Sequence, residues 1–228
     1  MAKETLRFEN VAKRIGSGTI LDRISFTLHQ GRALALVGSN GAGKSTVLKV
    51  AAGVWGRTGG RLERFGTMVS LAANSDARIG YLGERSFLYE NLSLIENLRL
   101  YCRLWGLDPR DTQLDEVVWQ VGLSWCQHDR IQSYSRGMRQ RAALARVWLV
   151  RPKLWVLDEP ESGLDDTGRR WLVNLLCEEK QSGASFLIAT HRPDLMESGL
   201  DLVASLESGR LAHWWSVAST QDIHQVKF

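Results

Sequence analysis

Short apolar runs recur along the chain, and most are followed by a turn and a segment with helical spacing. The clearest runs are residues 33–37, 154–157, 186–189 and 202–206. Apolar runs of this length predict strands that are buried on both faces. Because strands that alternate with helices favour a parallel arrangement, the pattern predicts an α/β fold with a mainly parallel sheet.

Helical spacing follows three of these runs. Residues 46–51 carry apolar side chains at helical intervals and should stop near Gly53, residues 167–181 predict a second helix, and a further helix is expected from Pro193. Glycine and proline at these points are typical helix boundary residues. The sheet is therefore expected to be covered by helices.

The first residues show a different pattern. Residues 6–8 and 24–28 alternate apolar and polar side chains, which predicts half-buried antiparallel strands. Residues 56–77 are predicted as loop and edge strand, and residues 79–82 as a short strand. An N-terminal antiparallel β subdomain is thus expected beside the parallel sheet.

Residues 84–151 interrupt this pattern with predicted helices. Ser93 and Glu96 form a capping box that predicts a helix ending at Gly106. A second helix is expected near residues 115–121, and a third opens around Ser135. These residues are therefore predicted to form a helical insertion.

With 228 residues, the chain is long enough to bury one substantial core. We predict a single domain over residues 1–228. Residues 1–83 and 152–228 are expected to form its α/β core with the β subdomain, and residues 84–151 its helical subdomain.

Charge and apolar content exclude some classes of function. The net charge of +4 comes from interspersed charges without a long basic block, so no nucleic-acid partner is expected. No apolar run approaches the roughly 18 residues of a membrane span, and the first residues do not lead into a signal peptide. Three cysteines without metal-ligand spacing predict free thiols. A cytoplasmic chain that touches a membrane only through a partner or through its own surface is expected.

The stretch between the first apolar run and the first helix carries the strongest chemical signal. It reads Gly38-Ser39-Asn40-Gly41-Ala42-Gly43-Lys44-Ser45-Thr46 and fits the P-loop pattern G-x-x-x-x-G-K-[ST]. Its glycines let backbone N–H groups face phosphate oxygens, and the following helix adds its positive end. Lys44 is predicted to contact the β- and γ-phosphates and Ser45 to bind Mg²⁺. An ordinary Gly-rich turn is the alternative.

Two other predicted strands end in chemically active residues. Asp158 and Glu159 directly follow residues 154–157, at the edge where open α/β sheets bind ligands. Asp158 is predicted to hold Mg²⁺, and Glu159 to accept a proton from, or orient, the water that attacks the γ-phosphate. His191 is predicted to emerge at the same edge. Taken alone, Asp158 and Glu159 would also be consistent with a solvated acidic turn. A lone histidine at a strand end, such as His191, would also be consistent with a structural role.

Ser135, Arg136 and Gly137 open the third helix of the insertion. A Ser hydroxyl, a Gly backbone and a helix N-terminus together predict a second anion site. By themselves, these residues favour a plain helix cap followed by basic surface residues.

The order of these motifs resembles the ATPase domain of the ATP-binding-cassette (ABC) family over nearly the whole chain. The similar segments are residues 38–45 (Walker A), 154–159 (Walker B with the catalytic glutamate), 135–140 (signature motif), 162–165 (D-loop) and His191 (switch histidine). The resemblance implies a P-loop NTPase (RecA-like) core, ATP and Mg²⁺ as cofactors, and ATP hydrolysis.

The resemblance also implies partners. A head-to-tail homodimer is expected, in which Ser135, Arg136 and Gly137 of one subunit close over the ATP that Lys44 holds in the other. Asp165 of the D-loop is also expected to bind the nucleotide. A separate transmembrane permease is expected to carry the substrate, because no residue here can form a path across lipid. The chain is therefore expected at the cytoplasmic face of the inner membrane, as a peripheral subunit.

Three positions depart from the family pattern. Arg136 stands where the signature motif usually has glycine, which makes that loop bulkier. Glu84 stands where a glutamine is usual and puts a carboxylate near the Mg²⁺. Ile15 stands where an aromatic residue normally stacks on adenine. Because stacking on a base is worth about 1–3 kcal/mol in nucleic-acid sites, weaker base selectivity is expected.

Residues 143–149 and 154–160 look like the ATPase subunit of the haem exporter of cytochrome c maturation, within the ABC-2-type exporter group. The sequence thus predicts the ATPase subunit of a bacterial ABC exporter, with haem as the narrower candidate cargo. Two alternatives remain open. One is a soluble ABC protein that acts on ribosomes or DNA, although such members usually carry two cassettes or long coiled-coil insertions. The other is a non-catalytic ATP-binding regulator, which Glu84, Arg136 and Ile15 would favour.

Overall fold

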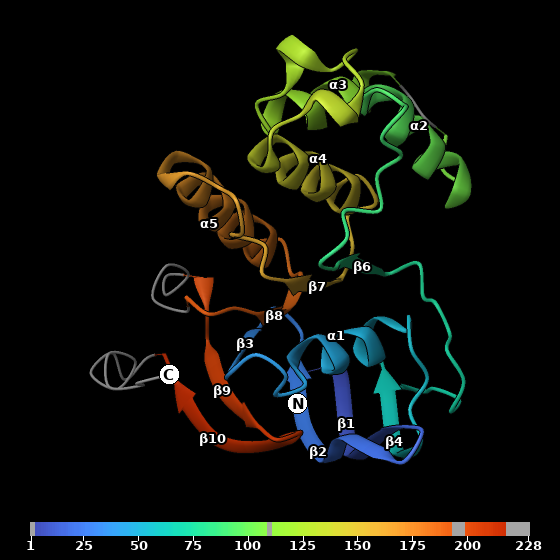
Figure 1. Ribbon diagram of the computed structural model, residues 1–228, viewed down its shortest axis with the longest axis vertical. Coiled ribbons are helices and arrows are strands. Elements are labelled where there is room, and N and C mark those ends of the chain that lie inside the picture. Colours follow the sequence, from blue (N-terminus) through green and yellow to red (C-terminus); the bar gives the residue numbers. More distant parts are fainter. Residues whose placement is uncertain (1–2, 109–110, 193–198, 218–228) are drawn as a thin grey trace.

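The computed structural model describes residues 3–108, 111–192 and 199–217. The strands are β1 (Glu4–Ile15), β2 (Gly18–His29), β3 (Ala33–Val37), β4 (Gly59–Arg64), β5 (Thr67–Met68), β6 (Ile79–Leu82), β7 (Leu154–Asp158), β8 (Ser185–Ala189), β9 (Leu202–Glu207) and β10 (Arg210–Ser216). The helices are α1 (Lys44–Ala52), α2 (Leu94–Leu104), α3 (Asp111–Gln120), α4 (Arg136–Trp148) and α5 (Asp166–Gln181), with short 3-10 turns at Ser124–Cys126 and Ile131–Ser133. Figure 1 shows α1 beside the sheets and α2 to α5 gathered above them.

The larger sheet has the strand order β10-β9-β3-β8-β7-β6. Its neighbours pair in parallel except β10 and β9. Strands β3, β7 and β8 are buried along their whole length, which explains their uninterrupted apolar runs. The predicted α/β fold with a mainly parallel sheet is confirmed.

The smaller sheet has the order β2-β1-β4-β5 and is antiparallel throughout. On its inner face the rings of Phe8 and Phe26 stack 4.6 Å apart. This confirms the antiparallel strands expected near the N-terminus. Residues 56–77 differ in part from the expectation, because β4 pairs on both sides and only β5 lies at the edge.

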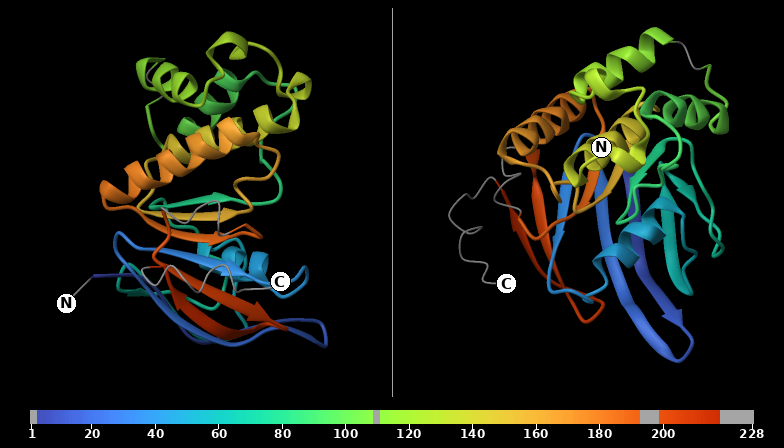
Figure 2. Two further views of the ribbon diagram at one scale, coloured as in Figure 1. Left: turned by 90° about the vertical axis from the view of Figure 1, so that its left-hand side faces the viewer. Right: turned by 45° about the horizontal axis from the view of Figure 1, so that its top comes forward.

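The parallel sheet is covered on both faces. Apolar residues of α1 and of the antiparallel sheet pack against one face of the parallel sheet. Apolar residues of α2 to α5 belong to the core on its other face. The left-hand view of Figure 2 shows α2 and α3 farther from the sheets than α5. Trp155 is fully buried in this layer and lies 5.7 Å from the ring of Phe186.

The helical part follows the predicted signals. Ser93 and Glu96 form the expected capping box, with Ser93 N donating to Glu96 Oε2 at 2.8 Å and Glu96 N to Ser93 Oγ at 3.3 Å. Helix α3 begins earlier than the segment 115–121 that was expected. The helix expected from Pro193 falls on residues 193–198, which lie outside the described residues. Within the described part of the chain, no helix combines the length and apolar character that a membrane span requires.

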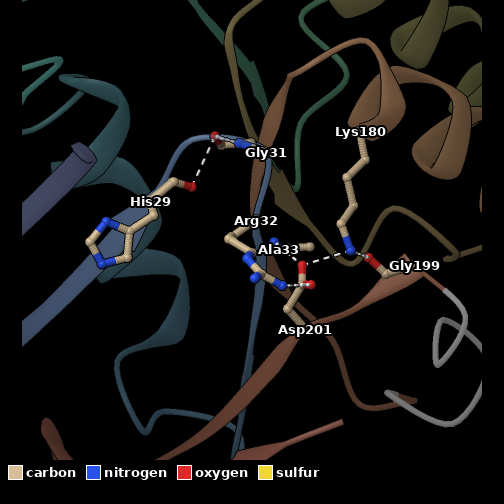
Figure 3. A network of polar contacts seen from close by, with 8 residues as sticks. His29, Gly31, Arg32, Ala33, Lys180, Gly199 and Asp201 are labelled. Carbon is tan, nitrogen blue, oxygen red and sulfur yellow. Dashed lines mark hydrogen bonds and ion pairs between the residues drawn. The ribbon is translucent and has the colours of Figure 1, made fainter. Parts of the chain in front are cut away.

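Asp201 joins α5 to the start of β3, just before β9 begins (Figure 3). Its Oδ2 accepts hydrogen bonds from Ala33 N at 2.8 Å and forms an ion pair with Lys180 Nζ at 2.6 Å, while Oδ1 accepts from Arg32 at 2.7 Å. Burial would raise the pKa of Asp201, but these three donors, Lys180 first, outweigh it and hold the pKa below its ordinary value. The network anchors the end of the sheet opposite the candidate site.

Asp201→Asn is expected to lower the free energy of unfolding by about 1–3 kcal/mol at pH 7, because an amide cannot replace the charge-assisted hydrogen bonds. The folded pKa lies below the unfolded value of about 3.9. The wild-type advantage is therefore present above that pH and is lost as the pH falls through the folded pKa. Urea unfolding from pH 7 to pH 3 measures the difference. A loss that stayed constant down to pH 3 would contradict this assignment.

The matched control is Asp166→Asn. The side chain of Asp166 is 85% exposed and pairs with Arg169 on the surface. Surface pairs contribute little, so this variant should unfold within about 0.5 kcal/mol of the wild type at every pH.

Candidate functional site

The P-loop lies between the end of β3 and the start of α1. Gly43 adopts a positive φ of 107° and caps the helix, and its carbonyl accepts hydrogen bonds from Thr46 N and Val47 N at 3.0 Å each. Gly38 adopts a φ of 146° immediately after the strand. The loop therefore has the strand, turn and helix context that the motif requires, and the free N–H groups of the first turn of α1 form an anion-binding end.

Lys44 is the first residue of α1, directly after this loop, and is only 7% exposed. Its Nζ donates to the carbonyl oxygens of Gly38 at 2.7 Å and Ser39 at 3.1 Å. Burial lowers the pKa of Lys44, and the nearby carboxylates of Glu159 and Asp158 partly offset this effect. A buried ammonium group whose hydrogen bonds go to neutral carbonyls is suited to bind an anion.

Asp158 is the last residue of β7 and is buried. Burial raises the pKa of its carboxyl group and Glu159 adds to this, while a hydrogen bond with the side chain of Ser45 acts against it. The pair brings a carboxylate and a hydroxyl group together from β7 and α1. Both are oxygen ligands of the kind that Mg²⁺ prefers.

Glu159 follows Asp158 in a strained backbone conformation. Its φ is 46°, a region that side-chain-bearing residues rarely adopt. Its N–H donates to the carbonyl of Ala189 at 2.9 Å, and its Oε1 lies 3.0 Å from Nε2 of His191. The ends of β7 and β8 therefore hold the strained residue from two sides, as at many functional sites. The structure places Glu159 and His191 at one edge, as the sequence predicted.

A cleft of about 720 Å³ runs beside this edge. Its lining residues are Ser45, Gly83, Glu84, Ser86, Tyr134, Arg136, Arg139, Gln140, Asp158, Glu159 and Ser162. Of the predicted site residues, it thus brings together the Ser45–Asp158 pair, Glu84, Glu159 and Arg136. The cleft has acidic groups from the sheet edge on one side and basic groups from α4 on the other.

Other predicted site residues lie elsewhere. Ile15 is 51% exposed at the end of β1 and does not line the cleft. Ser135 caps α4, with its Oγ accepting from Met138 N at 3.2 Å. Asp165 caps α5, with its Oδ1 accepting from Gly168 N at 2.8 Å. A Cβ added at Gly137 would lie 2.8 Å from the Gly163 carbonyl oxygen, so the signature and D-loop turns touch within one chain.

Several polar contacts at the site had no signal in the sequence. Gln140 Nε2 donates to the carbonyl of Pro160 at 3.0 Å, and Arg136 donates to Ser162 Oγ at 2.7 Å. Glu161 is buried and accepts a hydrogen bond from Thr190, the residue before the histidine. Burial raises the pKa of Glu161. Only the pairing of β7 with β8 reveals that this carboxylate supports the second strand end.

A family model described as ABC transporter matches residues 21–162, which is more than half of the chain. The chain belongs to the ABC transporter family. It is an ATP-binding subunit of an ABC transporter and an ATPase, and its fold is that of ABC cassette structures, as the motifs predicted.

Similar proteins support this assignment. The uncharacterized ABC transporter ATP-binding protein YhcH of Bacillus subtilis is 35% identical over 92% of this chain and 69% of its own length. The lantibiotic transport ATP-binding protein SrtF of Streptococcus pyogenes is 31% identical over 90% of this chain and 88% of its own. A solved ATP binding subunit of an ABC transporter has a TM-score of 0.84 and 26% identity, covering 94% of this chain and 91% of that chain.

Gly38→Ala is expected to destabilise this ABC subunit and to abolish ATP binding. A Cβ there would lie 2.3 Å from the carbonyl oxygen of Leu206. Gly41→Ala is the matched control, because Gly41 also has a positive φ of 82° but no heavy atom within 4 Å of an added Cβ. The control should lose about 1–2 kcal/mol through backbone strain alone, and Gly38→Ala roughly 2 kcal/mol more. Urea unfolding and binding of a fluorescent ATP analogue measure both, and equal losses would refute the predicted clash.

Proposed function

We propose that this subunit hydrolyses Mg²⁺-ATP with Glu159 as the catalytic residue, working as a homodimer that powers an exporter through a separate membrane permease. The observation that carries the catalytic part is the position of Glu159. Its strained backbone is held by the Ala189 carbonyl, and its carboxylate meets His191 at 3.0 Å. A carboxylate fixed in this way can orient one water molecule for attack.

The residues beside Glu159 fit a magnesium ion. Ser45 and Asp158 supply a hydroxyl and a carboxylate in direct contact, and Glu84 lines the same cleft. When bound, Mg²⁺ would neutralise charge on the β- and γ-phosphates of ATP. We assign Ser45 and Asp158 as its ligands and place Glu84 beside them.

The other residues of the chain position the nucleotide. Lys44 would exchange its bonds to the Gly38 and Ser39 carbonyls for phosphate oxygens, and the P-loop N–H groups would surround the phosphates. Glu159 would accept a proton from the attacking water, and His191 would hold Glu159 in place and face the γ-phosphate.

A second copy of the chain would complete the site. Ser135 is exposed at the N-terminus of α4, where a helix favours anions, and Gly137 lies two residues further on, in the first turn of the same helix. We propose that these residues and Arg136 close over ATP held by the other subunit, with Asp165 at the same interface. Arg136 is bonded to Ser162 of its own D-loop, so the signature and D-loop turns would move together.

The proposal of export rests on relatives. SrtF is named for lantibiotic transport, and LnrL of Bacillus subtilis, 28% identical, for linearmycin resistance. PhnC of Frankia casuarinae, 32% identical, is named for phosphonates import. Transport into inverted membrane vesicles, with the permease present, distinguishes the two directions. A subunit found with ribosomes or DNA instead of membranes would favour the soluble alternative.

Haem is the narrower cargo hypothesis. Residues 143–149 and 154–160, which suggested it, contain two tryptophans with structural roles: Trp155 is fully buried, and Trp148 Nε1 donates to Glu179 at 2.8 Å. They therefore carry no information on cargo. Loss of haem export on deletion of the subunit would support this hypothesis, and unchanged haem export would exclude it.

Glu159→Gln is expected to lower ATP turnover by roughly 10²–10⁴-fold while ATP still binds, because the amide cannot accept the proton. Lys44→Ala should weaken ATP binding by roughly 10–100-fold through loss of its charge-assisted hydrogen bonds. Phosphate release in membranes that contain the permease measures the turnover, and calorimetry measures ATP binding.

The control is Glu116→Gln, which changes an exposed carboxylate on α3 and should behave as wild type. Undiminished turnover in Glu159→Gln would exclude the mechanism, and absence of turnover in the wild type would favour the regulator alternative.

A further inference from the structure

Arg146 is a buried cation in α4 that the catalytic mechanism does not use. It is 5% exposed. Its Nη2 donates to the Tyr81 carbonyl at 2.9 Å, and its guanidinium lies 5.7 Å from the Phe87 ring and 5.1 Å from the Tyr101 ring. It thus contacts the end of β6, the loop that follows and α2. Such a position ties three segments together through one side chain.

The loop of residues 83–89, the first part of the connection from β6 to α2, is the segment that these contacts hold. Phe87 adopts a positive φ of 56°, an unusual conformation for a bulky residue. The Tyr101 hydroxyl donates to the Phe87 carbonyl. Asn97 holds the next part of the loop, because its Oδ1 accepts from Tyr89 N at 2.8 Å and its Nδ2 donates to Tyr89 O at 3.1 Å. A strained loop residue is therefore fixed from two helices.

The same loop lines the nucleotide cleft with Gly83, Glu84 and Ser86. Helix α4 lines the cleft with Arg136, Arg139 and Gln140 in its first turns, and it holds the loop through Arg146, about 9 Å beyond Gln140 along its axis. The helix and the loop are thus joined at a point remote from the phosphates. Arg146 therefore provides a direct physical connection between α4 and the loop that carries Glu84.

We propose that Arg146 and Tyr101 are positioning residues that latch the 83–89 loop onto the helical part, so that Glu84 and Ser86 stay at the nucleotide cleft during turnover. This inference rests on the proposed role of the cleft residues in binding and hydrolysing the nucleotide. The latch consists of the Arg146 contacts with Tyr81, Phe87 and Tyr101, and of the hydrogen bond from Tyr101 to Phe87.

The test uses Tyr101→Phe, which removes one hydroxyl group and keeps the ring. Arg85 is exposed in the middle of the loop, so trypsin cleavage after Arg85 reports loop opening, with cleavage after the exposed Arg130 as internal reference. We expect cleavage after Arg85 to rise roughly 3–10-fold, the effect of one hydrogen bond. In the complex with the permease, kcat should fall because fewer molecules hold Glu84 and Ser86 at the cleft, while the KM for ATP changes less than about twofold.

The matched control is Tyr89→Phe, on the same loop. Its side chain is 54% exposed, and Asn97 holds its backbone rather than its hydroxyl group. This control should match the wild type in both cleavage and turnover. Arg146→Lys keeps the positive charge but loses the planar guanidinium group. It should raise cleavage after Arg85 at least as much as Tyr101→Phe does. Thermal unfolding identifies a variant that fails to fold, in which case Tyr101→Phe decides alone.

The outcomes separate this inference from the ATPase proposal. Unchanged cleavage after Arg85 in Tyr101→Phe overturns the latch, and faster cleavage with unchanged kcat overturns its role in positioning. A wild-type complex without ATP turnover would remove the ATPase proposal, and with it the positioning role. Even then, the cleavage experiment would show whether Tyr101 anchors the loop.

Discussion

The site depends on the ammonium group of a buried lysine, whose hydrogen bonds within the described residues go to backbone carbonyls and not to a carboxylate. Lys44 is 7% exposed and donates to two backbone carbonyls, while the carboxylates of Asp158 and Glu159 act on it from further away. A buried charge is costly unless it is paired and hydrogen-bonded. The P-loop carbonyls provide hydrogen bonds to the Lys44 ammonium group but carry no negative charge. A nucleotide phosphate would supply the negative charge that this group lacks.

The parallel register of the sheet brings the remaining groups to this cation. Leu36 of β3 and Asp158 of β7 both lie opposite Ala189 of β8, so the three strands end at nearly the same level. The P-loop, the two carboxylates and His191 therefore meet at one edge. The same edge explains how Glu159 tolerates its positive φ, since its N–H and its carboxylate are both held by the end of β8.

Local signals in the sequence predicted most of the fold and much of the site. The P-loop and the capping box at Ser93 depend on neighbouring residues, and buried strands are visible as apolar runs. The left-handed conformation of Glu159 and the contact between Arg146 and Phe87 could not be predicted. Glu159 is strained only because β8 pairs beside it, and Arg146 meets a loop far away in sequence. Ile15 occupies the sequence position at which the family usually has an aromatic residue, yet it does not line the cleft that the structure forms.

One chain, on this account, holds half of a nucleotide site, and Ser135 of a second copy completes it. Mixing two inactive variants, Lys44→Ala and Ser135→Arg, with the permease tests this most directly. Half of the randomly mixed dimers would contain one intact composite site out of two, so the account predicts roughly a quarter of wild-type ATPase activity. A mixture as inactive as the separate variants would contradict it, because both residues would then act within the same chain.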